Sequence, residues 1–365
     1  MYGTKIPSLV NDSNSDFRPL KTQQGSRITS VQESLLQECE KDIIWYRDNF
    51  FGKNHANFLG GETPVGPVAL SIIKDGNSYK ILYRTKQGCE RLGIGAEHVR
   101  VQWYRKLLGL GPTLNNVVKA VSGNIPIDML KLCKNPNIPN ELLAMEERQV
   151  IKSYKIGVAY LRGNQCTESE MFSNQYENAS EDYKQFLNFL GETIELKGWK
   201  GYRAGLDVNE GQTGTYSVYT KWQGYEIMFH VGTHLPYKVG DTQQLERKRH
   251  IGNDIVIIIF QDKGTKPFDL STITSHQNHI IAVIQPHNDH QYKFSICTRN
   301  GVPPFNPPIP EPAIMNKDSI SRDFFLHKLV NGERASYKAP GFASKLSRTR
   351  AVLLMDIIGR YTAKK

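Results

Sequence analysis

The sequence has little that would place the chain in or across a membrane. Its longest wholly apolar run, Ile255–Phe260, is far shorter than the roughly 20 residues that span a bilayer. Residues 1–7 lack the apolar segment of a secretory signal. The chain also lacks a Gly-x-x-x-x-Gly-Lys-Ser/Thr phosphate loop and a Gly-x-Ser-x-Gly nucleophile motif, and Gly109-Leu-Gly111 is followed by Pro112, where a dinucleotide-binding fingerprint would continue into its turn. These absences argue against a chain that binds nucleotide on its own or acts as a serine hydrolase.

Cysteines and charge exclude further classes. The five cysteines are scattered without a Cys-x-x-Cys pair, so neither a disulfide framework nor a zinc ribbon is indicated, and a reducing, cytoplasmic setting is expected. The pairs His276-x-x-His279 and His287-x-x-His290 resemble metal-ligand spacing, but no cysteine supports them and we do not expect a metal site. The net charge of +10 favours an acidic partner only weakly.

The 365 residues suggest about two globular domains. Residues 1–30 are polar and predict a flexible tail, and residues 31–150 predict an N-terminal domain. A helical pattern runs from Leu35 to Tyr46, and Asp75-Gly76 between two apolar runs predicts a β-hairpin with a primed turn.

Residues 151–365 predict a second domain in which strands alternate with helices. Ser180 can cap a helix that presents one apolar face and ends at Gly191. Expected strands and helices follow in order: Lys155–Leu161, Thr215–Trp222, Tyr225–Val231, a helix over Asp241–Ile251, Ile255–Phe260, Ile280–Ile284, Tyr292–Cys297, and helices over Ser321–Val330 and Phe342–Arg360. This order predicts a layered α/β fold.

The most informative segment is residues 243–254. Arg247, Lys248, Arg249 and His250 fall in the last turn of the expected helix, where cations complement its carbonyl end. The plain interpretation is a solvated basic helix end. Asn253 favours a functional role over this plain interpretation. It follows Gly252 at the junction into a buried strand, and its carboxamide offers one hydrogen-bond donor and one acceptor on a rigid edge.

At these residues the chain resembles the Rap GTPase-activating proteins of the Rap/Ran-GAP domain family. The resemblance covers the whole second domain and, less specifically, the first, and it is greatest to the Rap/Ran-GAP-domain-like and signal-induced proliferation-associated subgroup. The blocks that carry it are Arg247–Val256 with Ile259–Gln261, Phe189–Gly191, Lys197–Arg203, Gly205–Asp207, Thr213–Tyr219, Glu226–Val231, Leu235–Tyr237 and Pro307–Pro310, preceded by Tyr46–Lys53 and Gly66–Val68.

This resemblance implies a protein that accelerates GTP hydrolysis on a Rap-type small GTPase in its GTP form. GTP and Mg²⁺ then belong to the partner, and this chain needs no cofactor of its own. Asn253 matches the family's asparagine thumb, which orients the attacking water in trans. His250 matches a position that supports the catalytic helix. Lys248 and Arg249 match positions that are implied to engage the GTPase, and Lys155, at the start of the first strand of the catalytic domain, matches a further basic position. Arg247 is expected either to bind the GTPase with them or only to decorate the helix.

The resemblance also implies a G-domain-like α/β catalytic domain and an N-terminal mixed α+β domain of the dimerisation type, so that the protein is a homodimer. The hairpin at Asp75-Gly76 is a candidate part of the dimer sheet. A cytoplasmic protein that reaches membranes through its lipidated partner is expected, without a transmembrane segment and without nucleic-acid binding.

Two alternatives remain open. In the first alternative the partner is Rheb or Ral instead of Rap, although Asp254–Val256 and Phe260-Gln261 resemble the Rap branch more closely. The chain is otherwise a catalytically silent dimeric scaffold that binds a small GTPase, against which the presence of Asn253 argues. Nucleic-acid binding driven by charge ranks last, since no motif for it is present.

Overall fold

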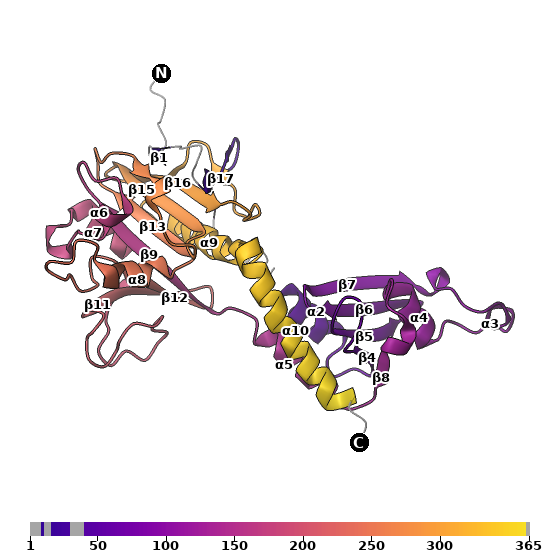
Figure 1. The fold of residues 1–365 in the computed structure, drawn as a ribbon. Coiled ribbons are helices and arrows are strands. Elements are labelled where there is room, and N and C mark those ends of the chain that lie inside the picture. Colours follow the sequence, from indigo (N-terminus) through magenta and orange to yellow (C-terminus); the bar gives the residue numbers. More distant parts are fainter. Residues whose placement is uncertain (1–8, 11–15, 30–39, 363–365) are drawn as a thin grey trace. The chain divides into compact units, whose positions relative to one another are not determined.

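The computed structural model describes residues 9–10, 16–29 and 40–362, and these divide into two units (Figure 1). Unit 1 consists of residues 1–36 and 152–342, and unit 2 consists of residues 37–151 and 343–365. The sequence predicts residues 343–365 to be part of the second domain. In the structure they belong instead to unit 2, with residues 37–151. The C-terminal segment packs with the N-terminal unit because its apolar side chains complete that unit's core.

Unit 1 is built on a mixed sheet with the strand order β10-β11-β12-β9-β13-β15-β16-β18, in which β2 also pairs with β16. The three central pairings, β12 with β9, β9 with β13 and β13 with β15, are parallel. The strands are β2 Phe17–Pro19, β9 Ser153–Leu161, β10 Glu192–Glu195, β11 Tyr216–Trp222, β12 Tyr225–Val231, β13 Val256–Gln261, β15 Ile280–Asn288, β16 Gln291–Arg299 and β18 Ile314–Asn316.

Helices cover both faces of this sheet, which is why β13 is apolar at nearly every position and buried throughout. On one face lie α7 Glu181–Leu190 and α9 Ser319–Ser336, and Phe186 of α7 contacts both Phe325 of α9 and Phe260 of β13. On the other face, α6 Glu168–Met171 and α8 Leu245–Gly252 pack Met171 and Ile251 into one core with Ile257. The α/β expectation is confirmed, and Ser180 accepts the predicted N-cap hydrogen bond.

Part of the expected N-terminal tail is ordered on unit 1. Arg18 of β2 lies opposite Thr298 of β16, and β3 (Thr22–Gln23) runs parallel to β17 (Ile309–Pro310). A further parallel pair joins β1 (Leu9–Val10) to β14 (Phe268–Asp269). Polar composition suggested a flexible segment, but backbone hydrogen bonds to distant strands fix these residues.

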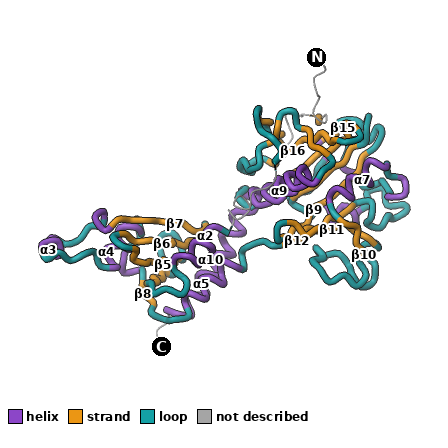
Figure 2. Tube along the Cα trace, turned by 180° about the vertical axis from the view of Figure 1, so that it is seen from behind, coloured by secondary structure: helices purple, strands orange, loops and turns teal. Residues whose placement is uncertain are grey.

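Unit 2 holds an antiparallel sheet with the order β7-β6-β5-β4-β8 (Figure 2). The predicted hairpin is present, with Gly76 at φ +57° in its turn, but β5 and β6 lie inside the sheet; its edges are β7 and β8. A dimer sheet would therefore extend through an edge strand. The elements are α2 Lys41–Asn49, β4 Ala56–Gly60, β5 Val68–Asp75, β6 Ser78–Thr85, β7 Gly88–Gly95, α3 Trp103–Leu107, α4 Leu114–Val121, β8 Lys131–Cys133 and α5 Ile138–Glu147. Residues 35–39 of the predicted first helix lie outside the described residues.

The last helix, α10 Pro340–Thr362, is bound into unit 2 by charge as well as by apolar packing. The Arg350 guanidinium donates to both oxygens of the Glu146 carboxylate, at 2.6 and 2.8 Å, and Arg84 lies 3.4 Å from the same group. Burial alone would raise the pKa of Glu146. The hydrogen bonds from Arg350 and the positive charges of Arg350 and Arg84 outweigh it and hold this pKa below its usual value. Within the described residues, none of the helices is long and apolar enough to span a bilayer.

Candidate functional site

Helix α8 carries most of the predicted site residues, and it begins at Leu245 rather than at Asp241 as the sequence suggested. The Asp241 carboxylate accepts hydrogen bonds from the backbone N–H groups of Gln243 and Leu245, which closes a turn in place of a first helical turn. Gln244 takes a left-handed conformation at φ 45°, and its buried amide bonds to both backbone groups of Lys238. The helix therefore starts from a fixed loop.

The end of α8 is held by side chains from the loop before β15. A helix leaves its last carbonyls without intrahelical partners. Asn278 donates to the carbonyl of Ile251 at 3.2 Å and to that of Asp254 at 2.6 Å, and Ser275 donates to the carbonyl of Gly252. The chain is thus tied down on each side of the point where Asn253 stands.

Asn253 is exposed and closes the helix as its C-cap residue, with φ −92° and ψ 2°. The side-chain Nδ2 of Asn253 donates to the carbonyl of Arg249 at 2.8 Å, and Lys155 Nζ donates to the backbone carbonyl of Asn253 at 2.8 Å. The Oδ1 atom accepts no hydrogen bond from the described part of the chain. One amide face therefore braces the helix end, and the acceptor faces solvent.

A buried charge cluster lies directly below Asn253. The Asp254 carboxylate is fully buried; Lys155 Nζ lies 3.2 Å from one of its oxygens, and His230 Nδ1 lies 2.9 Å from the other. His230 Nε2 is hydrogen-bonded to the carbonyl of Ala204 at 3.0 Å, and this second bond orients the ring.

The strand register explains how these residues meet. In the parallel sheet, Met228 of β12 lies opposite Lys155 of β9, and Val256 of β13 lies opposite Ile156. Gly157 lets α8 approach β9, because a Cβ at this position would lie 2.8 Å from Ile251 and 3.2 Å from Asp254. Figure 1 shows α8 beside β9, close to the start of the parallel strands.

Two further titratable groups adjoin the cluster. His250 packs edge-on against His230, with ring centroids 5.6 Å apart, and burial together with the neighbouring His230 and Arg249 lowers its pKa. Glu333 of α9 is buried and accepts a hydrogen bond from Tyr337 at 2.9 Å. Burial, reinforced by the negative charge of Asp254, raises the pKa of Glu333 to about 8. The raised pKa favours the protonated, neutral form of Glu333 at pH 7, and the lowered pKa of His250 favours its neutral imidazole.

Arg247 does not lie on the surface, and the structure corrects its expected role in binding a partner. Its side chain is 2% exposed, and its guanidinium donates to the carbonyls of Phe172, Asn174, Leu235 and Pro236. Arg247 therefore fastens two loops to α8, and its guanidinium is not accessible to another protein.

Lys248 and Arg249 differ in what holds them. Lys248 Nζ lies 2.9 Å from the buried carboxylate of Glu168, and this carboxylate also accepts a hydrogen bond from Thr274. Arg249 is exposed and forms an ion pair with Glu246 at 2.8 Å on the same helix. Arg249 is thus the freer of the two cations, while Lys248 also neutralises a buried charge.

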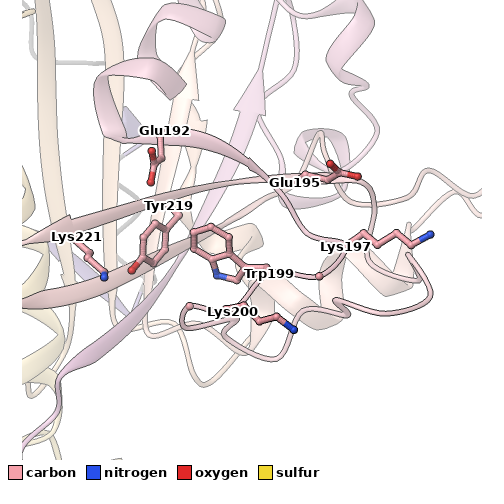
Figure 3. Close-up of a pocket in the computed structure, with 9 residues that line it drawn as sticks. Glu192, Glu195, Lys197, Trp199, Lys200, Tyr219 and Lys221 are labelled. Carbon is pink, nitrogen blue, oxygen red and sulfur yellow. The ribbon is translucent and has the colours of Figure 1, made fainter.

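The site is a convex helix end rather than a cavity. A hollow of about 530 Å³ lies elsewhere on unit 1, beside β10 and β11, where Trp199 packs edge-on against Tyr219. Figure 3 shows the ammonium groups of Lys197 and Lys200 directed away from the Trp199 ring. None of the six predicted site residues lines this hollow. The described residues also contain no cluster of three metal-ligating side chains, and His279 bonds instead to the carbonyl of Gln277.

Comparison with known proteins identifies the domain that contains this helix end. The family model of Rap/ran-GAP matches residues 171–351. These residues belong to the Rap/ran-GAP family. The Rap/ran-GAP match includes α8, Asn253 and the cluster partners His230 and Glu333, whereas Lys155 and Glu168 precede its first residue.

Relatives of the Rap/ran-GAP domain extend the likeness over most of the chain. Signal-induced proliferation-associated 1-like protein 3 of Homo sapiens is 36% identical over 363 residues, which cover 95% of this chain and 20% of that protein. GTPase-activating Rap/Ran-GAP domain-like protein 3 of Gallus gallus is 39% identical over 336 residues, covering 88% of this chain and 35% of that protein. This chain therefore spans about a fifth to a third of the relatives' lengths.

One solved structure, entitled "Structure of the TSC2 GAP domain", aligns with a TM-score of 0.39 and 27% identity. The alignment covers 56% of this chain and 97% of that one.

The sequence reasoning missed the residues that hold the Rap/ran-GAP helix end from behind. Asp254 and His230 stood inside the blocks that carried the family resemblance, but nothing local marked them as partners. Glu168, Asn278 and Glu333 lie far from α8 in sequence, and only the fold brings them to it. His230 is a buried polar residue in β12, a strand that is apolar apart from His230 and Glu226, and this is the signal that the sequence offers.

Proposed function

We propose that this chain is a GTPase-activating protein that stimulates GTP hydrolysis on a Rap-type small GTPase, with Asn253 inserted in trans. The observation that carries the proposal is an exposed carboxamide on a helix end whose neighbouring carbonyls are bonded to Asn278, Ser275 and Lys155. Membership of residues 171–351 in the Rap/ran-GAP family supports it.

The chemistry suits a carboxamide. Phosphoryl transfer depends on a positioned water and on charge stabilisation, and the protein forms no covalent bond to the phosphoryl group. Asn253 Oδ1 can accept a hydrogen bond from the attacking water and so orient it, and the second N–H of its amide can donate a hydrogen bond. GTP and Mg²⁺ are held by the partner, so this chain contributes a rigid, correctly aimed amide and no cofactor.

We propose the roles of the remaining residues from their surroundings near Asn253. Arg249 meets the partner as an exposed charge, and Lys248 does so from its tether on Glu168. His250, the next residue on α8, supports the helix as a neutral ring packed against His230. Lys155 holds the Asn253 carbonyl, so we assign it to positioning rather than to partner contact.

The partner is proposed to be Rap rather than Rheb or Ral on the sequence of Asp254–Val256 and Phe260-Gln261 alone. A homodimer in the cytoplasm, recruited to membranes by a lipidated partner, and a G-domain-like catalytic domain complete the proposal. They rest on the family resemblance. Sedimentation equilibrium of the full chain tests the dimer: a monomer at concentrations that support activity rejects it.

Single-turnover hydrolysis of GTP preloaded on Rap tests the activity, with and without this chain and with Rheb and Ral as controls. Asn253→Ala should lower the stimulated rate by ~10³-fold or more while leaving Rap binding nearly intact. Asn253→Asp is the matched variant, because it keeps the size but replaces the amide donor with a second acceptor.

Three results would reject parts of the proposal. Near-normal stimulation by Asn253→Ala removes Asn253 from the mechanism. Stimulation of Rheb or Ral but not Rap changes the partner. Rap binding by folded wild-type chain without any acceleration leaves the scaffold interpretation.

A further inference from the structure

Unit 2 exposes a concentrated apolar surface at α3 and the loop that follows it. Trp103 is 77% exposed, Leu107 is 79% and Leu108 is 67%. Tyr104 and Leu110 belong to the same surface, which we call the α3 tip. Trp103 and Leu107, like Tyr104 and Leu108, are four residues apart and so form two neighbouring rows on the helix. Isolated exposed apolar residues are ordinary, but five within eight positions are not.

The α3 tip lies in a stretch of sequence, bounded by Glu97 and Asp128, that contains basic but no acidic residues. From His98 to Ile127 the sequence contains no aspartate or glutamate, whereas Arg100, Arg105, Lys106 and Lys119 are basic. Arg100 and Lys106 are exposed. The apolar side chains thus project from a basic segment, and any surface that covers them must accept positive charge.

The segment holds its shape without covering these side chains. Arg105 donates from Nη2 to the carbonyl of Gly111 at 3.0 Å, and the Leu110 N–H donates to the carbonyl of Arg105 at 2.8 Å. Gly109, at φ +65°, makes the turn. The tip is therefore a closed turn with its apolar groups outside, rather than an unfolded stretch.

The base of the segment is anchored in the core of unit 2. Val99 is buried before the tip, and a Thr113 capping box starts α4 after it, with Val117 and Val118 buried. Tyr79 reaches from β6 to the carbonyl of Pro112 at 3.3 Å. Figure 2 shows α3 at the far end of a loop that extends away from β5, β6 and β7.

We propose that the α3 tip inserts into the interface of a membrane that contains anionic lipids. Tryptophan and tyrosine favour the headgroup level, leucines enter the acyl boundary, and lysine and arginine pair with lipid phosphates and carboxylates. The tip is convex, so it suits a soft, continuous surface. A second copy of the tip is disfavoured, because a two-fold contact would place Arg100 and Lys106 of both copies together.

Co-sedimentation with lipid vesicles tests the proposal on the full chain, with no GTPase present, so the outcome is independent of the proposed activity. Wild-type chain should bind vesicles of phosphatidylcholine mixed with phosphatidylserine and bind phosphatidylcholine alone more weakly. Leu107→Ser should reduce partitioning by about tenfold, and Lys106→Gln and Arg100→Gln by about fivefold each. Val352→Ser, at an apolar residue of α10 that is 64% exposed, is the matched control and should bind as wild type.

Fluorescence locates the contact. The chain has four tryptophans, and anionic vesicles should shift the emission of wild-type chain to the blue. Trp103→Phe should keep vesicle binding and lose most of this shift, because the ring that enters the interface no longer emits. Circular dichroism of each variant, expected to match wild type, verifies that the chain is folded.

Several outcomes overturn the proposal. Absence of vesicle binding by folded wild-type chain does so directly. Binding that Leu107→Ser leaves unchanged assigns the lipid contact to another surface. A dimer that Leu107→Ser converts to monomer, without lipid binding in either form, makes the tip a contact between copies.

Discussion

Lys155 donates a 2.8 Å hydrogen bond to the backbone carbonyl of Asn253, a residue 98 positions further along the chain. The same ammonium group lies 3.2 Å from the buried carboxylate of Asp254. Lys155 therefore fixes the backbone from which the exposed amide projects and neutralises the charge beneath it.

This position predicts a particular kinetic defect for Lys155→Met. Without its bond to the carbonyl, Asn253 loses its fixed aim, and a displacement of ~1 Å costs about 10²-fold in rate. The stimulated kcat should fall, and the KM for the GTPase should stay within about twofold. Lys221→Met, at an exposed lysine of β11, should leave both constants unchanged. A raised KM with normal kcat would instead make Lys155 a contact residue.

Arg247 and Arg249 stand two residues apart on α8, but their substitution should lower the stability of unit 1 by very different amounts. Arg247→Met leaves several buried carbonyls without donors and should lower the free energy of unfolding of unit 1 by about 3–5 kcal/mol. Arg249→Ala should cost less than about 0.5 kcal/mol. Hydrogen–deuterium exchange, which distinguishes the two units, should show faster exchange at residues 172–174 and 235–237 only in Arg247→Met. Similar exchange in both variants would contradict the role given to Arg247.

Arg249 should instead govern the encounter with the partner. An exposed charge acts mainly on the association rate, and salt screens it over about 8 Å at physiological ionic strength. Arg249→Ala should slow association with the GTPase several-fold at low salt and hardly at all at high salt, as measured by stopped-flow mixing. An equal defect at both salt concentrations would indicate a short-range contact.

Glu333 predicts a pH dependence of stability. The folded state keeps its proton up to pH about 8, whereas an unfolded glutamic acid releases it near 4.5. Between these values the unfolded state binds fewer protons, so this group lowers the free energy of unfolding as pH rises. Glu333→Gln keeps an oxygen for the Tyr337 hydroxyl and cannot ionise. It should flatten the decline of stability between pH 5 and 8, and parallel urea-unfolding curves for variant and wild type would contradict this.

Much of the fold follows from local patterns in the sequence. Asp75-Gly76 predicts its hairpin because the turn requires positive φ, and Ser180 predicts the start of α7 because its hydroxyl caps the helix. The apolar run after Gly252 predicts a covered strand, and the structure has β13 there. In each case neighbouring residues supply the determining interaction.

Other features depend on residues that are distant in sequence. The run of cations at 247–249 looks solvated, yet the carbonyls of Phe172 and Leu235 draw Arg247 into the interior. The sequence predicts a helix from Asp241, but the Asp241 carboxylate instead accepts a hydrogen bond from the Leu245 N–H and closes a turn. The pairing of Arg18 with Thr298 likewise cannot be read from polar composition. The position of Asn253 was predictable; the cluster that holds it was not.

The division of unit 2 between two stretches of chain has a consequence for synthesis. Leu354, Ile357 and Ile358 of α10 share a core with Leu59 and Ile138. A nascent chain that has emerged only as far as residue 342 already contains every strand of unit 1 but still lacks the side chains that close the sheet of the earlier unit. Unit 2 therefore completes its native core only after the strands of unit 1 have been synthesised.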